Sequence, residues 1–177
     1  MRATWIVVAA LILLLPSTAL AGEYYLSDED AYWWYWDGTP NYEVLIPSRG
    51  FSYVQVDWSG QTTLYVTLKD KGPLLIVGTA PGTDVQKLWQ AMTAPWAHLL
   101  NNPRTTQDTE ITTDQGLRAR FLVLSGSASG GPAAMIRLVA FTREGRTAYL
   151  MFVGNEREYA GDLRQYWLRA VHSFRWR

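Results

Sequence analysis

The spacing of the apolar residues changes three times along this chain, and these changes restrict the folds that it can adopt. Between residues 42 and 81, short apolar segments alternate with turns, which is typical of β-strands. Residues 83–102 carry apolar side chains every three or four positions, as an amphipathic helix does. Strand-like segments follow, and a second helical pattern closes the chain. The order strands, helix, strands, helix predicts an α+β fold.

The strand-like segments predict an antiparallel sheet. In the first half they read "YEVLIP", "FSYVQVDW", "TTLYVTLKD" and "LLIVGTAP", joined by short turns. In the second half they read "LRARFLVLSG", "AAMIRLVAFTR" and "TAYLMFVG", and the tight Glu144-Gly145 turn predicts a hairpin between the last two. "FLVL" and "YLMFV" are almost wholly apolar, which indicates strands covered on both faces. We therefore expect the antiparallel sheet to be sandwiched between helices.

The first helical pattern has a recognisable start and end. Thr83 and Gln86 have the spacing of a capping box, which predicts the first turn. Pro95 removes a backbone donor inside the pattern, so we expect a kink or a break there. The run Asn101, Asn102 and Pro103 is expected to end the helix.

The second helical pattern is expected to cover residues 155–176. Asn155 and Glu158 have the spacing of a capping box, which predicts its start. Its apolar stripe consists of Tyr159, Leu163, Tyr166, Trp167, Ala170, Val171 and Phe174.

The first residues resemble a secretory signal. Arg2 precedes an unbroken apolar run from Trp5 to Leu15, and "PSTALA" at residues 16–21 has the small residues of a cleavage site. We expect cleavage after Ala21 and a periplasmic or secreted location; an uncleaved anchor is the alternative. The expected organisation is a signal peptide at 1–21, an aromatic and acidic N-terminal hairpin at 22–41, and a single α+β sandwich domain at 42–177.

Composition excludes several kinds of chemistry. The chain has no cysteine, so it lacks disulfides, thiol catalysis and cysteine-based zinc sites, and the fold depends on its core. The formal net charge is zero, and no basic run could follow a phosphate backbone. We therefore expect no nucleic-acid partner.

The stretch "AYWWYWDG" at residues 31–38 contains the candidate binding surface. In a strand, three of its rings would share one face and two the other. The rings could cover an end of the sheet, or they could form an exposed platform that stacks on sugar rings or docks a hydrophobic partner. Peripheral contact with a membrane surface is a third interpretation. The candidate binding residues are Tyr32, Trp33, Trp34, Tyr35 and Trp36.

No motif in the sequence indicates a catalytic residue, a metal site or a cofactor site. His98 and His172 lack partners at ligand or triad spacing, and we interpret both as surface or helix-end residues. The segment "SGSASGGP" at 125–132 has the glycine separation of a phosphate loop but no lysine, so we interpret it as a connection. The acids at 28–30 lack calcium-loop spacing and are expected to form a solvated turn.

The order of elements, the "GLRARF" strand, the hairpin "IRLVAFTREGRTAYLMFVG" and the closing "AVHSFRW" resemble the PsbP/Mog1 superfamily over Tyr42 to Arg177. An NTF2-like cone and a small lipocalin-like barrel are the alternative folds. The resemblance implies an α-β-α sandwich and a mostly noncatalytic role, as an accessory subunit, adaptor or exported bacterial protein. It supplies no catalytic residues to carry over.

Three functional hypotheses follow. The first is an exported noncatalytic binding or accessory protein of the cell envelope with a protein partner. The second is a carbohydrate or peptidoglycan binder that uses Tyr32, Trp34 and Trp36. The third is an enzyme whose site the sequence does not reveal.

Overall fold

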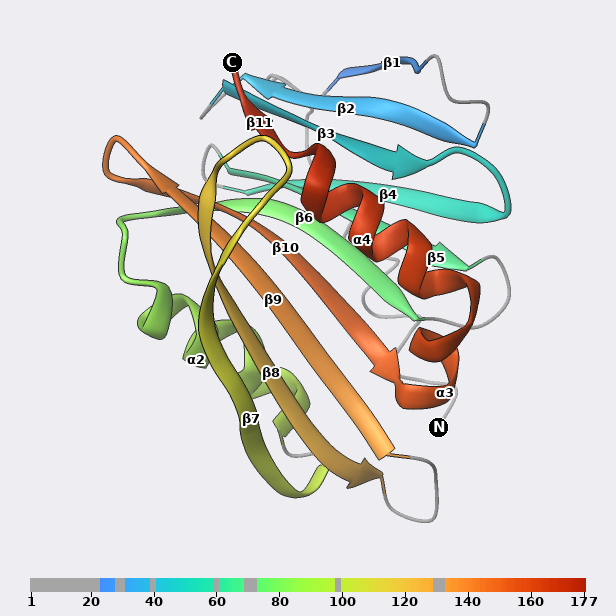
Figure 1. Ribbon diagram of the computed structural model, residues 1–177, viewed down its shortest axis with the longest axis vertical. Coiled ribbons are helices and arrows are strands. Elements are labelled where there is room, and N and C mark those ends of the chain that lie inside the picture. The colour runs from blue at the N-terminus through green and yellow to red at the C-terminus, as the bar shows by residue number, and fades with distance from the viewer. Residues whose placement is uncertain are drawn as a thin grey trace.

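Two antiparallel sheets make up most of the computed structural model, which describes residues 23–27, 31–38, 41–58, 61–68, 73–97, 100–128 and 133–177 (Figure 1). The larger sheet has the order β4-β5-β6-β10-β9-β8-β7. Its strands are β4 (Phe51–Trp58), β5 (Gln61–Leu68), β6 (Leu74–Pro81), β7 (Leu100–Thr112), β8 (Arg118–Ala128), β9 (Ala133–Arg143) and β10 (Arg146–Asn155). The smaller sheet has the order β1-β2-β3-β11. Its strands are β1 (Glu23–Leu26), β2 (Tyr32–Gly38), β3 (Asn41–Pro47) and β11 (Arg175–Trp176).

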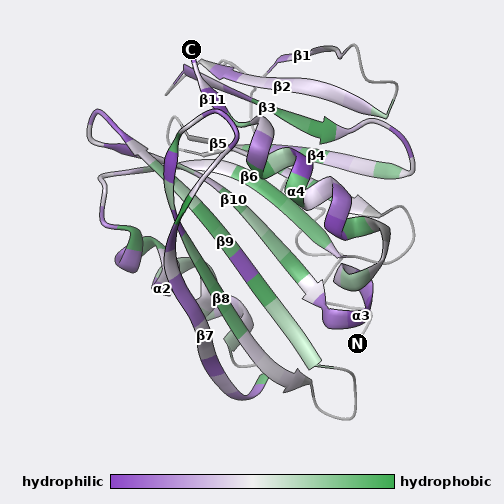
Figure 2. Ribbon diagram, viewed as in Figure 1, coloured by the Kyte–Doolittle hydropathy of each residue, from purple (hydrophilic) through white to green (hydrophobic). Residues whose placement is uncertain are grey.

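The central strands of the larger sheet are buried on both faces, as their apolar runs predicted. Leu150 and Met151 are neighbours on β10 and point to opposite faces, yet both are fully buried. On β8, Leu122, Val123 and Leu124 are buried in the same way. Figure 2 shows the apolar residues concentrated along these strands, whereas the edge strand β7 is largely polar. The predicted hairpin between β9 and β10 is confirmed, with Glu144 and Gly145 in the turn.

Helix α2 (Val85–Ala97) covers one face of the larger sheet. Trp89 is the buried centre of its apolar stripe. Trp89 belongs to a core cluster with Ile76, Leu122, Leu124, Ile136, Leu138, Ala140, Tyr149 and Met151 of the sheet. The residues at the helical spacing identified in the sequence are therefore the ones that pack.

The opposite face is covered by helix α4 (Arg164–Ser173) together with the smaller sheet. Trp167, Ala170 and Val171 of α4 share a core cluster with Tyr35, Tyr42, Val44 and Ile46 of the smaller sheet and with inward residues of the larger one. The fold is thus mostly antiparallel sheet with few helices. The expectation of helices on both faces needs this correction, because the aromatic β2 and the apolar β3 bury much of the second face.

The first helix begins and ends differently from its sequence-based prediction. Its cap is Asp84 and not Thr83, because the Asp84 carboxylate accepts a hydrogen bond from the Lys87 backbone N–H at 2.9 Å. The helix continues past Pro95 to Ala97, and Leu100 already begins strand β7. The prediction that the helical pattern reaches Leu100 is therefore wrong, since pairing with β8 takes over this segment.

The second helical pattern is divided into three parts. The predicted cap is confirmed: Asn155 and Glu158 form a reciprocal capping box at α3 (Glu156–Glu158). A π-helical segment, η1 (Tyr159–Leu163), follows, and Gly161 leaves the helical region there with φ −86° and ψ −147°. Helix α4 ends at Ser173, so the expectation of a helix to residue 176 is wrong. The chain leaves α4 at Ser173 because β11 pairs with the edge of β3.

Strand β2 lies inside the smaller sheet, between β1 and β3. The β1–β2 pairing corresponds to the expected aromatic hairpin, and the β2–β3 pairing joins that hairpin to the segment beginning at Asn41. No helix among the described residues is long and apolar enough to cross a membrane. The expected signal peptide and its cleavage site after Ala21 lie outside the described residues.

Candidate functional site

Strand alternation divides the five candidate aromatic residues between the two faces of β2. Tyr35 points into the core and is fully buried. Trp33 packs on the same side, with its ring 5.9 Å from that of Tyr53 and the two planes at 22°. Tyr32, Trp34 and Trp36 share the opposite face and are half-buried. The structure therefore places Trp34 and Trp36 on the outer face and Tyr32 against Tyr166 of α4, with ring centroids 5.9 Å apart, while Trp33 and Tyr35 lie in the packing between the sheets.

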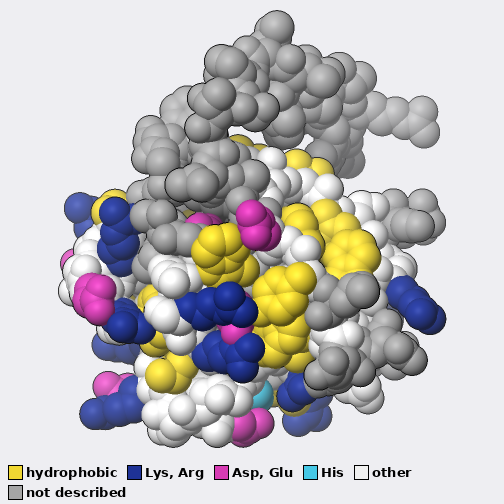
Figure 3. All heavy atoms as spheres, turned by 90° about the horizontal axis from the view of Figure 1, so that it is seen from above, with side chains coloured by type: hydrophobic (Ala, Val, Ile, Leu, Met, Phe, Trp, Pro, Cys, Tyr) yellow, Lys and Arg dark blue, Asp and Glu magenta, His cyan; other side chains and the backbone are white. Residues whose placement is uncertain are grey.

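The outer face of the smaller sheet carries charged residues that the sequence did not single out. Together with Tyr25, Trp34 and Trp36, these residues form what we call the arginine–aromatic cluster. Its members are Tyr25, Trp34, Trp36, Glu43, Arg175 and Arg177. Seen from above, this end of the molecule presents Lys and Arg side chains beside hydrophobic ones (Figure 3).

Glu43 is the centre of the cluster. Its side chain is only 1% exposed, yet it forms ion pairs with both Arg175 and Arg177. It also accepts a hydrogen bond from the Tyr25 hydroxyl. Burial alone would raise the pKa of Glu43, but hydrogen bonds from Tyr25 and Arg175, together with the charge of Arg175, lower it below the ordinary value. Glu43 is therefore a carboxylate at neutral pH, and it fixes two cations.

The two guanidinium groups lie over aromatic rings. The Cζ atom of Arg175 is 4.4 Å from the ring centroid of Trp34, and that of Arg177 is 5.5 Å from Tyr25. Arg177 also donates from Nη2 to the Tyr25 hydroxyl at 2.8 Å. The rings of Tyr25 and Trp34 are nearly parallel, with an angle of 16° and centroids 6.2 Å apart. Such cation–π contacts order both partners, while the side chains of Arg175 and Arg177 stay 46% and 45% exposed to solvent.

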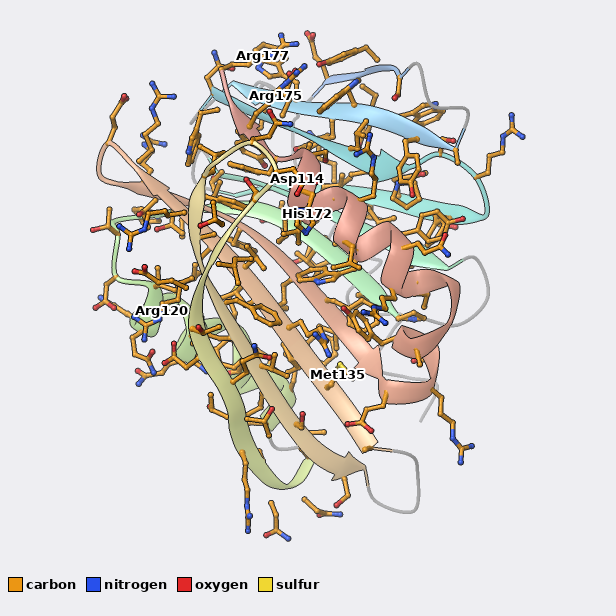
Figure 4. The ribbon with its side chains drawn as sticks, in the orientation of Figure 1. Asp114, Arg120, Met135, His172, Arg175 and Arg177 are labelled. Carbon is orange, nitrogen blue, oxygen red and sulfur yellow. The ribbon has the colours of Figure 1, made fainter. Side chains whose placement is uncertain are left out.

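The register of three strands explains why these residues meet. Glu43 on β3 lies opposite Trp36 on β2 and opposite Arg175 on β11. The Arg177 backbone N–H donates to the Asn41 carbonyl at 2.9 Å, which continues the pairing by one residue. The Trp36 indole N–H donates to Asn41 Oδ1 at 2.5 Å. Figure 4 shows Arg175 and Arg177 on the C-terminal segment beside the smaller sheet.

One sequence signal could have identified the arginines. The closing "FRWR" alternates aromatic and basic residues, which is a strand pattern that places Arg175 and Arg177 on one face. The helical interpretation of residues 155–176 concealed it. Glu43 has no such signal, because a glutamate in an apolar strand is recognisable as a buried anchor only when its partners are known.

The remaining candidate groups lie elsewhere. His172 Nδ1 is 2.8 Å from Asp114 Oδ1, and this contact joins α4 to the β7–β8 turn (Figure 4). His98, the acids at 28–30 and residues 129–132 of the glycine-rich segment lie outside the described residues. The described part of the chain holds no group of three potential metal ligands.

A small pocket opens between α4 and the larger sheet. Its volume is 20 Å³, which is about the space of one water molecule. Its lining is apolar apart from Tyr166: Pro47, Phe51, Val66, Pro73, Leu74, Leu75, Phe152, Leu163, Tyr166 and Trp167. This pocket offers no carboxylate or imidazole to a bound substrate.

Comparisons with known proteins agree with the fold. No family model and no curated protein sequence matches the chain. The solution structure of cyanobacterial PsbP (CyanoP) from Synechocystis sp. PCC 6803 is similar over 92% of this chain and 97% of that one, with a TM-score of 0.55 and 12% identity. The chain therefore has a PsbP-like fold, as the sequence resemblance predicted.

Proposed function

We propose that this protein is a noncatalytic accessory protein of the cell envelope that binds a protein partner through the arginine–aromatic cluster. The observation that carries this proposal is the buried Glu43, which holds Arg175 and Arg177 in fixed positions beside Trp34 and Tyr25. The cluster lies on one sheet face and joins the first described strand to the last.

The composition of the cluster supports a protein partner. Tryptophan, tyrosine and arginine are the residues most enriched among binding hot spots at protein interfaces. Side chains that are already ordered lose less conformational entropy on binding, so a preorganised face binds more tightly than a flexible one. The exposed Glu23 of β1 lies opposite Trp36 on the same face, so Glu23 and Glu43 balance the two arginines, and recognition rests on the ordered guanidinium groups and rings rather than on net charge.

The proposed location rests on the apolar run and cleavage-like segment at residues 1–21. The proposed noncatalytic role rests on the PsbP-like fold, which is an argument by analogy.

Carbohydrate binding is the alternative use of the same face. A sugar ring stacks on an open aromatic face, but the guanidinium of Arg175 covers one face of Trp34. Trp36 is half-buried and is held to Asn41 through its indole N–H. A protein partner uses the guanidinium edges as well as the rings, so we favour it over a polysaccharide.

Site-specific photo-crosslinking in cells that produce the protein would test the proposal. A photoreactive phenylalanine analogue replaces Trp36 in one variant and Leu168, which is 38% exposed on α4, in a matched control. We expect a discrete crosslinked protein from position 36 and none from position 168. Arg175→Ala combined with Arg177→Ala should reduce that crosslink at least tenfold.

Two outcomes would contradict the proposal. Equal crosslinking from positions 36 and 168 would indicate nonspecific contact. An unchanged crosslink after loss of both arginines, in a variant shown by circular dichroism to be folded, would separate binding from the cluster. Cosedimentation of the wild-type protein with insoluble cell-wall polysaccharide would support the carbohydrate alternative.

A further inference from the structure

The larger sheet has a region of its inner face that α4 does not cover. Helix α4 crosses the front of β6 and β10, while the front of β7, β8 and β9 is bare of helices among the described elements (Figure 1). Segments α3 and η1 border this region beside β9 and β10. Met135, labelled in Figure 4, lies on β9 beside α3 at this border.

Arg137 of β9 lies in the middle of this face. Its strand neighbours in register are Val123 on β8 and Phe152 on β10, both buried and apolar. Its Cζ atom is 3.9 Å from the ring centroid of Tyr159 and 5.8 Å from that of Phe121. Arg137 is therefore half-buried, and its guanidinium lies against the ring of Tyr159.

The positive charge of Arg137 has no carboxylate partner within the described part of the chain. Its one hydrogen bond there runs from Nε to the Met135 sulfur at 2.9 Å, and sulfur is a weak acceptor. Glu158, next to Tyr159 in sequence, is engaged by the Asn155 backbone N–H in the capping box. On the opposite face of the β7–β8 hairpin, by contrast, Arg120 is paired with both oxygens of Asp108 at 2.6 and 2.8 Å.

A half-buried guanidinium without a counter-charge indicates a site for an anion. Withdrawing a charge from water is unfavourable unless an opposite charge compensates it. Because Nε is turned to Met135, the Nη1 and Nη2 edge remains for a ligand. That edge matches the two oxygens of a carboxylate in a bidentate pair.

The surroundings restrict the ligand further. The half-buried rings of Phe121 and Tyr159 supply the apolar surface beside the guanidinium, and Val123 and Met135 are buried next to them. An inorganic anion would leave this apolar surface unused, whereas an organic anion can cover it. Polar groups border the site on β8 and β7, where the Ser125 and Thr106 hydroxyls are 3.4 Å apart and the exposed Arg104 lies opposite Ser125.

We propose that Arg137 forms a binding site for an organic carboxylate whose apolar or aromatic body packs against Phe121 and Tyr159. The site is separate from the arginine–aromatic cluster and does not depend on its function. Arg137 binds the carboxylate through its Nη edge, while its guanidinium lies against the ring of Tyr159.

Titration of the full chain followed by NMR would test this site. The probes are benzoate, acetate and inorganic phosphate at constant ionic strength, because screening by salt changes with concentration. The readouts are the Arg137 Nε–Hε signal and the backbone amides of Phe121, Val123 and Tyr159. We expect saturable shifts with benzoate, weaker binding of acetate by at least threefold, and the weakest binding of phosphate.

Three variants provide the comparison. Arg137→Gln should weaken benzoate binding at least tenfold, and Arg137→Lys should weaken it less, since lysine keeps the charge but loses the planar fork. Arg120→Gln makes the same change in charge on the opposite face and should bind benzoate as the wild type does. If Arg137→Gln does not fold, benzoate binding by Arg137→Lys is compared with benzoate binding by Arg120→Lys.

The proposal has clear contrary outcomes. Absence of saturable shifts with any probe would overturn the site. Equal benzoate binding by wild type and Arg137→Gln would show that the guanidinium is not the receptor. Phosphate binding as tight as benzoate binding would overturn the assignment to an organic carboxylate.

Discussion

The ring of Phe174 stacks on that of Phe141, with centroids 3.8 Å apart and planes at 7°. Phe174 lies between α4 and β11, whereas Phe141 lies on β9, so the stack ties the C-terminal segment to the larger sheet. Tyr42 of β3 stacks on Phe174 as well, at 5.4 Å and 22°. The resulting three-ring stack holds β11 beside β3, where Arg175 meets Glu43.

Truncation of the stack should loosen the cluster as well as the core. Phe174→Ala should lower the free energy of unfolding by about 3–5 kcal/mol, and Phe174→Leu by less, because a fully buried ring is lost. Urea denaturation measures this change, and exchange of the Arg177 amide should accelerate in Phe174→Leu. The control Leu168→Ala, at an exposed position of α4, should change stability by no more than about 0.5 kcal/mol. An unaltered Arg177 exchange rate would argue against the role of the stack.

Glu43 should make stability depend on pH in the acid range. Its pKa in the folded protein is lower than its ordinary value of 4.5, so the unfolded state binds the proton more readily. The stabilisation is therefore complete above that value and is lost as the pH falls through the lowered pKa of the folded state.

Glu43→Gln tests this relationship. It should cost about 1–3 kcal/mol at pH 7 and flatten the pH dependence of unfolding below the ordinary pKa of 4.5. Glu110→Gln removes the partner of Arg118 in a pair exposed by 78% and 64%, and it should cost less than about 1 kcal/mol. A Glu43→Gln profile that parallels the wild type would show that Glu43 is not the titrating group.

Gly78 allows Tyr149 to lie across β6. A Cβ atom added at Gly78 would be 2.6 Å from the Tyr149 hydroxyl oxygen and 2.8 Å from its Cζ atom. Gly78→Ala should therefore destabilise the protein by about 1–3 kcal/mol, as overpacking does. Adding Tyr149→Leu should make the double variant less destabilised than the sum of the two single changes. Simple additivity in thermal denaturation would exclude the clash.

Tyr42 carries a buried hydroxyl without a hydrogen-bond partner among the described residues. Burial is the main cause that raises its pKa well above the ordinary value, so the group stays neutral. Tyr42→Phe should leave the free energy of unfolding unchanged or raise it by up to about 1 kcal/mol, because no hydrogen bond is lost.

Tyr149→Phe provides the matched control for Tyr42→Phe. Burial raises the pKa of Tyr149 to about 12, while its hydrogen bond with Thr63 acts in the opposite direction. This variant loses a hydrogen bond and should be destabilised by about 1 kcal/mol. Calorimetry of both variants should give changes of opposite sign or clearly different size. A loss of stability in Tyr42→Phe equal to that in Tyr149→Phe would reveal a partner for the Tyr42 hydroxyl.

The apolar spacing of the sequence determined the buried strands and the helix faces, but not the exposed edge strand β7 or the short β11. Local patterns sufficed there because burial determines where apolar residues stand in the sequence. Burial on both faces gives the continuous apolar run of β10, and burial on one face gives the helical spacing of apolar residues in α2 and α4. The Asn155–Glu158 cap was equally local, since its two hydrogen bonds lie within four residues. The PsbP-like fold followed from the order of these elements.

Only the tertiary structure decided which residues form the cluster. The end of the expected helix is the strand β11. Its backbone pairs with β3, and Phe174 just before it stacks on Phe141, and these tertiary contacts replace the helical hydrogen bonds. Glu43, Arg175 and Tyr25 are far apart in the chain, and their juxtaposition depends on the register of four strands. Local periodicity carries no information about that register, so the sequence identified the aromatic stretch but not the charges that surround it.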